Sequence, residues 1–568
     1  MYSYIFKTFR FLSFTIIVFC FFYSVFSVAS VSILMPFVNF IFTDYRLSAN
    51  TFLFSFSESD KSVLLAALCL ITWFIFLLKN LSFIAAQLQT SRMKNELLQR
   101  LREDYMQRVF GQDMPYFSKI PTGYITTRVF DVTRQLSEKL SVGFHDVARN
   151  VPLIILYSAV LIFISWKLMA LSLVLIPLIS LAGNRFHKIL QKSIADEQHA
   201  LSSLIHHVQQ KLYGIKLIKL FNSEQFELGK FHDQSSELKR VFQFRDRVES
   251  IGVSVVEMIG VSAGVLLLYV IGMETLGGQF QYGPGGFVLF IAAVFSLIDP
   301  VKNLIRSVHS FRESDVLLAM LRQLKVKVTG EHEYSQSPRL FEKQIVFENV
   351  SFQFENRSDP VFENLNMTIN KGEKIILAGK SGIGKSTLVD LLLGLYQPSA
   401  GVVSLDKIPL ININKTCLSR IFGVVTQEAF LFHDTIRNNV VYDMYEITDD
   451  QIMDALHKVL LSEWYIQQPR GLDTVIGDRG QTMSGGEKQR LILARLILRN
   501  PDILIFDEAT SSLDIPAEKA LFETILRLFS DKTMIFISHR HTLYPFGGRI
   551  VEIRHRGIVE HNVSSTFA

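Results

Sequence analysis

Cysteine is scarce in this sequence, which has only Cys20, Cys69 and Cys417 among 568 residues. Two of them fall in apolar runs and the third lies in the C-terminal half of the chain. Such a small and scattered set implies no disulfide framework. Each cysteine is better interpreted as a small buried apolar residue.

A strong net charge is also lacking. The chain has 58 Lys and Arg against 53 Asp and Glu, for a formal charge of +5. This small excess is no argument for nucleic-acid binding, because membrane topology alone enriches Lys and Arg. The mean hydropathy of +0.27 is high for a soluble protein, yet 20% of the residues are charged. The mixture indicates an apolar part joined to a water-soluble part.

Long apolar runs mark the first part. A membrane-spanning helix needs about 20 apolar residues, and the chain offers about six such stretches. They are roughly Phe11–Phe42, Val63–Ala86, Val151–Trp166, Leu168–Ala182, Ile251–Met273 and Phe287–Ile305. The third and fourth are separated only by Lys167, which predicts a tight helical hairpin. The first run is much longer than the core of a signal peptide, so we expect a membrane helix there.

Basic residues are distributed unequally between the connections. The stretch Glu274–Pro284 has no Lys or Arg, and the connection 43–62 has only Arg46 and Lys61. The second-to-third and fourth-to-fifth connections are rich in them (Arg92, Lys94, Arg100, Arg102, Arg108; Arg185, Lys188, Lys192, Lys211, Lys216, Lys219). Positive residues stay on the cytoplasmic side, so both termini are expected in the cytoplasm.

A phosphate-binding pattern, G-x-x-x-x-G-K-[ST], is matched in full by Gly379–Ser386. An apolar strand is expected before it, at Lys374–Ala378, and a helix from Lys385 onward. Glycines let the backbone wrap a phosphate chain, and Lys385 adds a positive charge. Ser386 offers a hydroxyl to Mg²⁺.

Two further segments follow in the C-terminal half. The run Met483-Ser484-Gly485-Gly486-Glu487 predicts a turn that opens a helix, where bare N–H groups and a hydroxyl suit a phosphate. The apolar strand Ile503–Phe506 ends in Asp507 and Glu508, two carboxylates that suit a metal ion and a water molecule.

These three segments, in this order, resemble the nucleotide-binding domain of an ABC (ATP-binding cassette) ATPase. The resemblance implies ATP and Mg²⁺ as cofactors and assigns roles by position. Glu508, His539, Gln427 and Lys385 are expected to be catalytic, and Ser386, Gln427 and Asp507 to hold the metal. Nucleotide-binding positions are Phe354, Gly379, Lys380, Ser381, Gly382, Ile383, Gly384, Lys385, Ser386, Thr387, Gln427, Ser484, Gly485, Gly486 and Asp514.

Several positions depart from the usual family pattern. Phe354 stands where adenine usually stacks on Tyr, and an aromatic face is sufficient for stacking. The signature has Met483 and Glu487 at its two ends in place of Leu and Gln, with Ser484 and Gly486 intact. In this family the signature of one subunit completes the site of another, so the resemblance implies a homodimer, with a heterodimer left open.

The order of the two parts implies the class of protein. A membrane α-helical domain with six helices (1–323), a linker (324–343) and an α/β P-loop NTPase domain (344–568) resemble half-transporters of the ABC exporter and flippase group (type IV). The turn regions 114–123 and 213–224 resemble the coupling helices by which the membrane domain of such exporters touches the ATPase. The resemblance implies ATP-driven export or flipping, with a bacterial inner membrane as the expected location.

The cargo is less well specified. The segment Ser32–Phe37 resembles the corresponding segment of flippases for lipid-linked oligosaccharides. This resemblance favours a lipid or lipid-linked saccharide as the transported substrate. A peptide or drug exporter and an ATP-gated channel or regulatory protein remain alternatives. Charged residues within the spans, Lys79, Glu257, Asp299 and Lys302, are candidates for a substrate cavity. Alternatively, they lie where helices extend past the bilayer to the inner interface.

Overall fold

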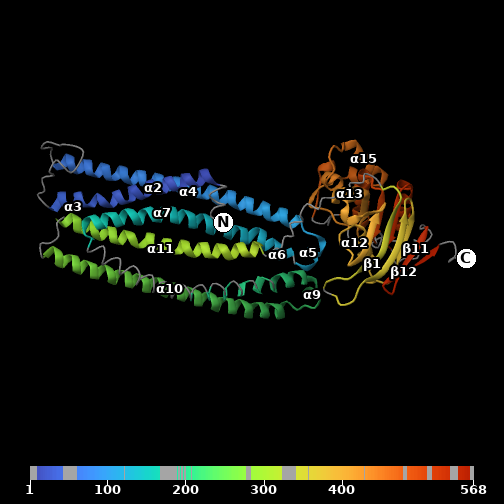
Figure 1. Ribbon diagram of the computed structural model, residues 1–568, viewed down its shortest axis with the longest axis horizontal. Coiled ribbons are helices and arrows are strands. Elements are labelled where there is room, and N and C mark those ends of the chain that lie inside the picture. The colour runs from blue at the N-terminus through green and yellow to red at the C-terminus, as the bar shows by residue number, and fades with distance from the viewer. Residues whose placement is uncertain are drawn as a thin grey trace. The chain divides into compact units, whose positions relative to one another are not determined.

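The computed structural model describes residues 9–42, 61–120, 122–166, 189, 192–193, 196–197, 200–201, 203–205, 207–276, 283–322, 341–355, 357–427, 429–477, 483–507, 515–537 and 548–562. The chain divides into two compact units (Figure 1). The first comprises Met1–Met106 and Thr126–Lys325, and the second Gln107–Ile125 and Val326–Ala568.

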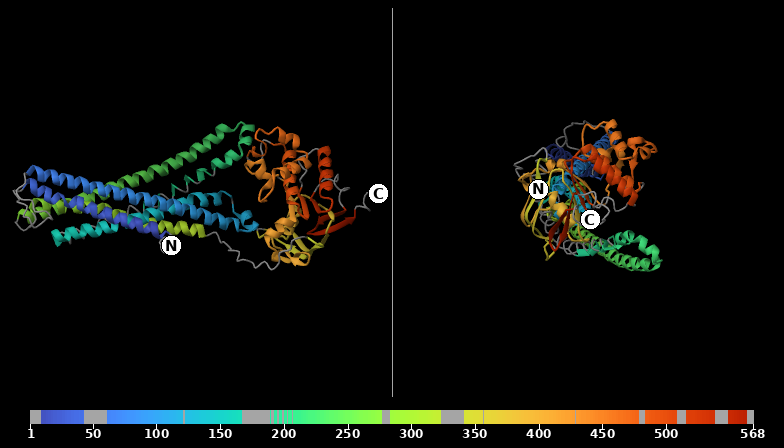
Figure 2. Two further views of the ribbon diagram at one scale, coloured as in Figure 1. Left: turned by 90° about the horizontal axis from the view of Figure 1, so that it is seen from above. Right: turned by 90° about the vertical axis from the view of Figure 1, so that its right-hand side faces the viewer.

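Helices of very different lengths form the described part of the first unit. They are α2 (Arg10–Ser32), α3 (Leu34–Phe42), α4 (Lys61–Phe110), α6 (Thr122–Thr127), the π-helix η1 (Arg128–Val132), α7 (Thr133–Ile164), α9 (Ile215–Leu220), α10 (Glu224–Leu276) and α11 (Gly283–Arg322), with α4 and α6 continuing into the second unit. Helices α2, α7 and α11 pack against one another. Helix α9 and the first part of α10 diverge from these helices in both views of Figure 2.

Apolar helices of membrane-spanning length are present as expected. Within the described residues, four stretches are long and apolar enough to cross a bilayer: Arg10–Ile41, Leu65–Phe110, Gly123–Ile164 and Gly285–Arg322. They cover the predicted first, second, third and sixth spans. The fifth lies on α10, and the fourth falls outside the described residues, so the count of six stays a prediction.

Polar side chains lie inside the packed helices. Thr90 Oγ1 of α4 and His145 Nδ1 of α7 are 3.0 Å apart and both residues are buried. The Ser24 hydroxyl of α2 donates to the carbonyl of Arg149 on α7, at 3.1 Å. Such bonds satisfy polar groups that would otherwise be costly in an apolar interior.

The second unit contains an α/β fold. Its helices are α5 (Met114–Lys119), α12 (Lys385–Leu392), α13 (Lys415–Ile421), α14 (Ile436–Val441), α15 (Asp449–Lys458), α16 (Ser462–Ile466), α17 (Gly485–Arg499) and α18 (Ile515–Leu528), with 3₁₀ turns η2 (Leu410–Asn412) and η3 (Gly471–Asp473). Its strands are β1 (Gln344–Phe352), β2 (Phe362–Asn370), β3 (Lys374–Ala378), β4 (Ala400–Leu405), β5 (Ile408–Pro409), β6 (Phe422–Val425), β7 (Asp434–Thr435), β8 (Val475–Ile476), β9 (Ile503–Asp507), β10 (Thr533–Ile537), β11 (Arg549–Arg554) and β12 (Gly557–Asn562).

Two larger sheets and one small antiparallel pair, β7–β8, organise this unit within the described residues. One has the order β12-β11-β3-β10-β9-β6, in which all neighbouring pairs are parallel except the β11–β12 hairpin. The other is antiparallel, in the order β2-β1-β4-β5. Alternate residues of β3 enter different apolar clusters, with Ile376 in one and Ile375 and Leu377 in the other. The parallel strands are therefore buried on both faces, which explains why they appear in the sequence as short continuous apolar runs.

Candidate functional site

Glycine conformations shape the phosphate loop between β3 and α12. Gly379, Gly382 and Gly384 have φ of 145°, 76° and 118°, values that side-chain-bearing residues rarely adopt. A Cβ on Gly384 would lie 2.6 Å from Val361 Cγ1. Strand β3 and the start of α12 lie at the predicted residues.

Lys385 is buried and turned onto its own loop. Its Nζ donates to the carbonyl of Gly379 at 2.9 Å and to that of Lys380 at 3.1 Å. These contacts hold the ammonium group among the backbone atoms that would surround a phosphate chain. The loop therefore has the shape and charge that a triphosphate requires.

Three expected metal-site residues lie at one edge of the parallel sheet. Asp507 ends β9, and Gln427 follows β6, the neighbouring parallel strand. The Ser386 hydroxyl lies 3.4 Å from Asp507 Oδ2. Neighbouring oxygen ligands of an octahedral Mg²⁺ are about 3 Å apart, since each bond is about 2.1 Å. The two oxygen donors therefore fit Mg²⁺.

Negative charge accumulates at the same edge. Burial, and to a smaller extent the charge of Asp507, raise the pKa of Asp390 on α12 to about 6. A cation beside Asp507 would offset this repulsion.

The signature opens α17 as predicted, but its groups are not bare. Ser484 Oγ accepts the backbone N–H of Glu487 at 3.3 Å, and Glu487 Oε2 accepts the backbone N–H of Ser484 at 2.7 Å. Together these bonds form a capping box. The N–H groups of Ser484 and Glu487 are therefore not bare, contrary to expectation, because side chains of the same helix start bind them. The role of Ser484 in binding phosphate stays a prediction.

Phe354 is half-buried beside two other aromatic rings. Its centroid lies 4.9 Å from that of Phe352 and 5.6 Å from that of Tyr396, both nearly perpendicular to it. The Arg357 guanidinium is 5.9 Å from the Phe354 centroid. Phe354 thus has neighbours on several sides but no parallel ring among these contacts.

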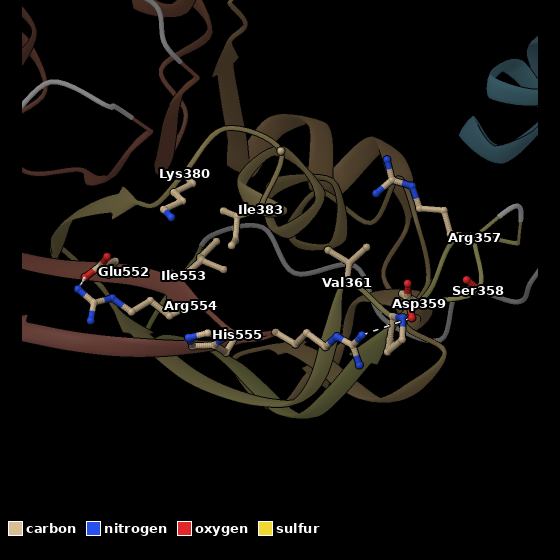
Figure 3. Close-up of a pocket in the computed structure, with 13 residues that line it drawn as sticks. Arg357, Ser358, Asp359, Val361, Lys380, Ile383, Glu552, Ile553, Arg554 and His555 are labelled. Atoms are coloured by element: carbon tan, nitrogen blue, oxygen red, sulfur yellow. Dashed lines mark hydrogen bonds and ion pairs between the residues drawn. The ribbon is translucent and has the colours of Figure 1, made fainter.

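A pocket of about 970 Å³ adjoins the phosphate loop (Figure 3). It is lined by Lys380, Gly382 and Ile383 of the loop, by Arg357–Val361, and by Glu552–Arg556 at the β11–β12 turn. The sequence interpretation missed the last two groups. The turn residues Ser358-Asp359-Pro360 were a usable signal for the first, because such a run reverses the chain. Nothing in the sequence indicated the second group, Glu552–Arg556. These residues lie beside the phosphate loop because β11 pairs with β3.

The first predicted coupling region belongs to the same unit as the ATPase fold. Asp113, which precedes α5, forms an ion pair of 2.7 Å with Lys415. At the other end of α5, Lys119 pairs with Glu355, next to Phe354. The second region contains α9, whose apolar side chains, such as Leu217 and Leu220, are exposed.

The other predicted site residues lie on the phosphate loop, on α12 or on α17, or they fall outside the described part of the chain. Lys380 and Ser381 are exposed on the loop. In the first turn of α12, Ser386 is exposed and Thr387 is buried. Gly485 and Gly486 form the first turn of α17. Glu508, Asp514 and His539 lie outside the described residues.

The charged candidates of the spans occupy different environments. Lys79 Nζ lies 5.3 Å from the Phe76 centroid and 5.9 Å from that of Tyr23. Asp299 and Lys302 are exposed on α11. Glu257 lies on α10, and its side chain is outside the described part of the structure.

Comparison with known proteins decides the family. A family model described as the ABC transporter transmembrane region matches residues 13–301, and one described as ABC transporter matches residues 362–511. The chain belongs to the ABC transporter family. Its membrane region and its ATPase are fused in one chain, as the sequence predicted.

Curated relatives and a solved structure agree with this membership. An "ATP-dependent lipid A-core flippase" of Pseudoalteromonas translucida (strain TAC 125) is 30% identical over 481 residues, covering 83% of this chain and 81% of the relative. One of Syntrophus aciditrophicus (strain SB) is 29% identical, covering 82% and 77%. The structure of a bacterial Atm1-family ABC exporter with ATP bound has the same fold, with a TM-score of 0.79 at 19% identity over 95% of this chain and 94% of that one.

These findings confirm the expected class of protein. The ABC transporter is a multi-pass membrane protein with a helical membrane domain followed by an ATPase domain. It binds ATP and couples ATP hydrolysis to transport across the membrane.

Proposed function

We propose that this ABC transporter is a homodimer in a bacterial inner membrane that flips or exports a lipid or lipid-linked saccharide. The domain organisation that we propose is a membrane domain (1–323), a linker (324–343) and an ATPase domain (344–568). The observation that carries the lipid substrate is the name shared by its relatives, ATP-dependent lipid A-core flippase, over most of both chains.

ATP hydrolysis is assigned to the residues at the edge of the parallel sheet. The loop Gly379–Thr387 binds the phosphates, and Lys385 exchanges its two carbonyl contacts for phosphate oxygens. Mg²⁺, held by Ser386, Asp507 and Gln427, would neutralise charge on the β- and γ-phosphates. Phe354 stacks on adenine.

The remaining roles come from sequence position. Glu508 orients the attacking water and takes its proton, and His539 contacts the terminal phosphate. Ser484, Gly485 and Gly486 of a second subunit complete the site together with Asp514. ATP then holds the two ATPase domains together, and its hydrolysis allows them to separate.

Exposed apolar side chains around α9 support the proposal that two copies of the chain form a dimer. Tyr213, two residues before α9, and Leu220, its last residue, are 92% and 73% exposed. Because exposed apolar clusters of this kind mark interaction sites, we assign α9 to a contact with the ATPase domain of the partner. A heterodimer would use the same surface.

Charge on α11 supports an anionic headgroup. Asp299, Lys302 and Arg306 are exposed, and their spacing of three and four residues places them on one helix face. Leu297 is buried, and its position along the helix places it on the opposite side. Two basic groups and one acidic group on this face would favour a phosphate or carboxylate, with Lys79 of α4 as a further cation.

Reconstitution into liposomes tests the proposal. The wild type should move lipid A or a lipid-linked oligosaccharide across the bilayer with ATP, and Glu508→Gln should abolish movement while ATP still binds. Lipid substrates should also raise ATP turnover, whereas peptides should not. Uphill movement by Glu508→Gln would overturn the pump, and stimulation by peptides alone would overturn the lipid substrate.

A further inference from the structure

Arg357 holds a defined position over the aromatic ring that we assign to adenine. Its guanidinium carbon lies 5.9 Å from the Phe354 centroid. We propose that Arg357 is a second base-binding residue, and that the adenine of ATP is clamped between the Phe354 ring and the Arg357 guanidinium. This inference rests on the proposed stacking role of Phe354.

The space between the two groups is close to what a base needs. Non-bonded atoms meet at about 3.5 Å, so a planar ring between two planar groups needs about 7 Å. The guanidinium would therefore retreat by about 1 Å, which a long Arg side chain achieves by small rotations. Phe352 and Tyr396 stand nearly perpendicular to Phe354, so neither stacks flat on it.

The backbone that carries Arg357 is held from within its own loop. Gln353 Nε2 donates to the carbonyls of Arg357 at 2.7 Å and Ser358 at 3.0 Å. The Arg357 N–H donates to the carbonyl of Phe354 at 3.0 Å. These bonds set the position of Arg357 relative to Phe354 before any ligand arrives, which reduces the ordering cost of binding.

A second element anchors the same loop from the far side. Arg556, at the β11–β12 turn, donates to Asp359 at 3.4 Å and to Glu363 of β2 at 2.7 Å. Arg556 has a φ of 67°, a left-handed conformation that is costly for a residue with a side chain. The bonds to the two carboxylates offset that cost. Among the contacts described, the Arg357 guanidinium contacts the Phe354 ring and no carboxylate.

The pocket reaches from Arg357 to the phosphate loop. In Figure 3, Arg357 and Lys380 stand on opposite sides, with Val361 and Ile383 between them. Cations at both sides of an apolar surface suit a molecule that joins an aromatic base to phosphates. Guanidinium groups stack on nucleobases in proteins that bind single-stranded nucleic acids, through the same planar contact.

Nucleotide binding by the full-length protein in detergent or nanodiscs tests the clamp. The probes are MgATP and magnesium tripolyphosphate, which has the phosphates without the base. Arg357→Ala and Arg357→Met should weaken MgATP by about 5- to 10-fold and leave tripolyphosphate unchanged. Arg357→Lys should bind MgATP with intermediate affinity, because an ammonium group interacts with the base but does not stack flat.

Controls separate this inference from the function on which it rests. Arg420→Ala, a change at an exposed residue of α13, should not alter either affinity. Equal losses for MgATP and tripolyphosphate in Arg357→Ala would overturn the clamp, as would no loss at all. If Phe354→Ala weakens MgATP while Arg357→Ala does not, only the clamp fails. If Phe354→Ala also has no effect, the assigned adenine site itself is wrong. Thermal unfolding of each variant checks that it remains folded.

Discussion

Ser484 and Glu487 cap each other at the start of α17. The Glu487 carboxylate accepts the Ser484 N–H at 2.7 Å, and the Ser484 hydroxyl accepts the Glu487 N–H at 3.3 Å. Glu487, which stands where the family usually has Gln, therefore stabilises the start of the helix. It does so by binding the N–H group of Ser484, the residue that we assign to phosphate binding.

Removing this carboxylate should destabilise the signature helix. Glu487→Ala loses half of the capping box and a negative charge at a helix N-terminus, and we expect the ATPase domain to lose about 1 kcal/mol of stability. Glu487→Gln is the matched control, because its amide oxygen can accept the same N–H. Its melting temperature should stay near that of the wild type. Equal melting temperatures for all three proteins would contradict the capping role.

The ion pair between Asp113 and Lys415 should matter for coupling more than for stability. Exposed pairs contribute about 0–1 kcal/mol, so Lys415→Glu should barely change the melting temperature. Because it places two like charges at the base of α5, it should reduce the stimulation of ATP hydrolysis by substrate, with basal hydrolysis retained.

A charge swap provides the control for that experiment. The double variant Asp113→Lys with Lys415→Glu restores opposite charges in reversed order. It should recover most of the stimulation, as measured in liposomes. If the double variant is as poor as the single one, the pair does not carry the coupling.

Close packing of α3 on α11 predicts a strong effect at Gly285. A Cβ there would lie 2.3 Å from the carbonyl oxygen of Met35 and 2.4 Å from Asn39 Oδ1, which accepts the Gly285 N–H. Gly285→Ala must therefore separate the helices, and we expect a loss of about 1–3 kcal/mol. Gly272→Ala on α10 has no heavy atom within 4 Å and serves as the control. Thermal unfolding in detergent should lower the transition of the first variant only.

Asp507 should be needed for the metal rather than for the nucleotide. Asp507→Asn keeps the shape of the side chain but removes the charge that would hold Mg²⁺, and hydrolysis should fall by about 100-fold or more. Binding of ATP measured in EDTA should be nearly unchanged. If ATP binding in EDTA falls as much as hydrolysis, Asp507 acts on the nucleotide pocket itself.

The ATPase fold was largely predictable because its motifs are local. Strands β3 and β9 lie at the predicted residues, since each is a short apolar run bounded by polar or turn residues. The helices after Gly384 and Ser484 were equally predictable from loop and cap residues. The membrane spans were found by hydropathy, but α4 extends to Phe110 and α10 begins at Glu224, so apolar length alone did not locate the ends of these helices.

Local motifs and hydropathy could not predict contacts between residues that are far apart in the sequence. The sequence alone determined a glycine-rich loop between β3 and α12, a strand that ends in Asp507, a helix that opens after Ser484 and an apolar membrane part, because each depends on neighbouring residues. Only the tertiary structure decided that Arg556 anchors the loop of Arg357, that Lys415 meets Asp113, and that Asn39 meets Gly285. The physical reason is that these pairs are joined by strand order and helix packing, which bring together residues that no local spacing relates.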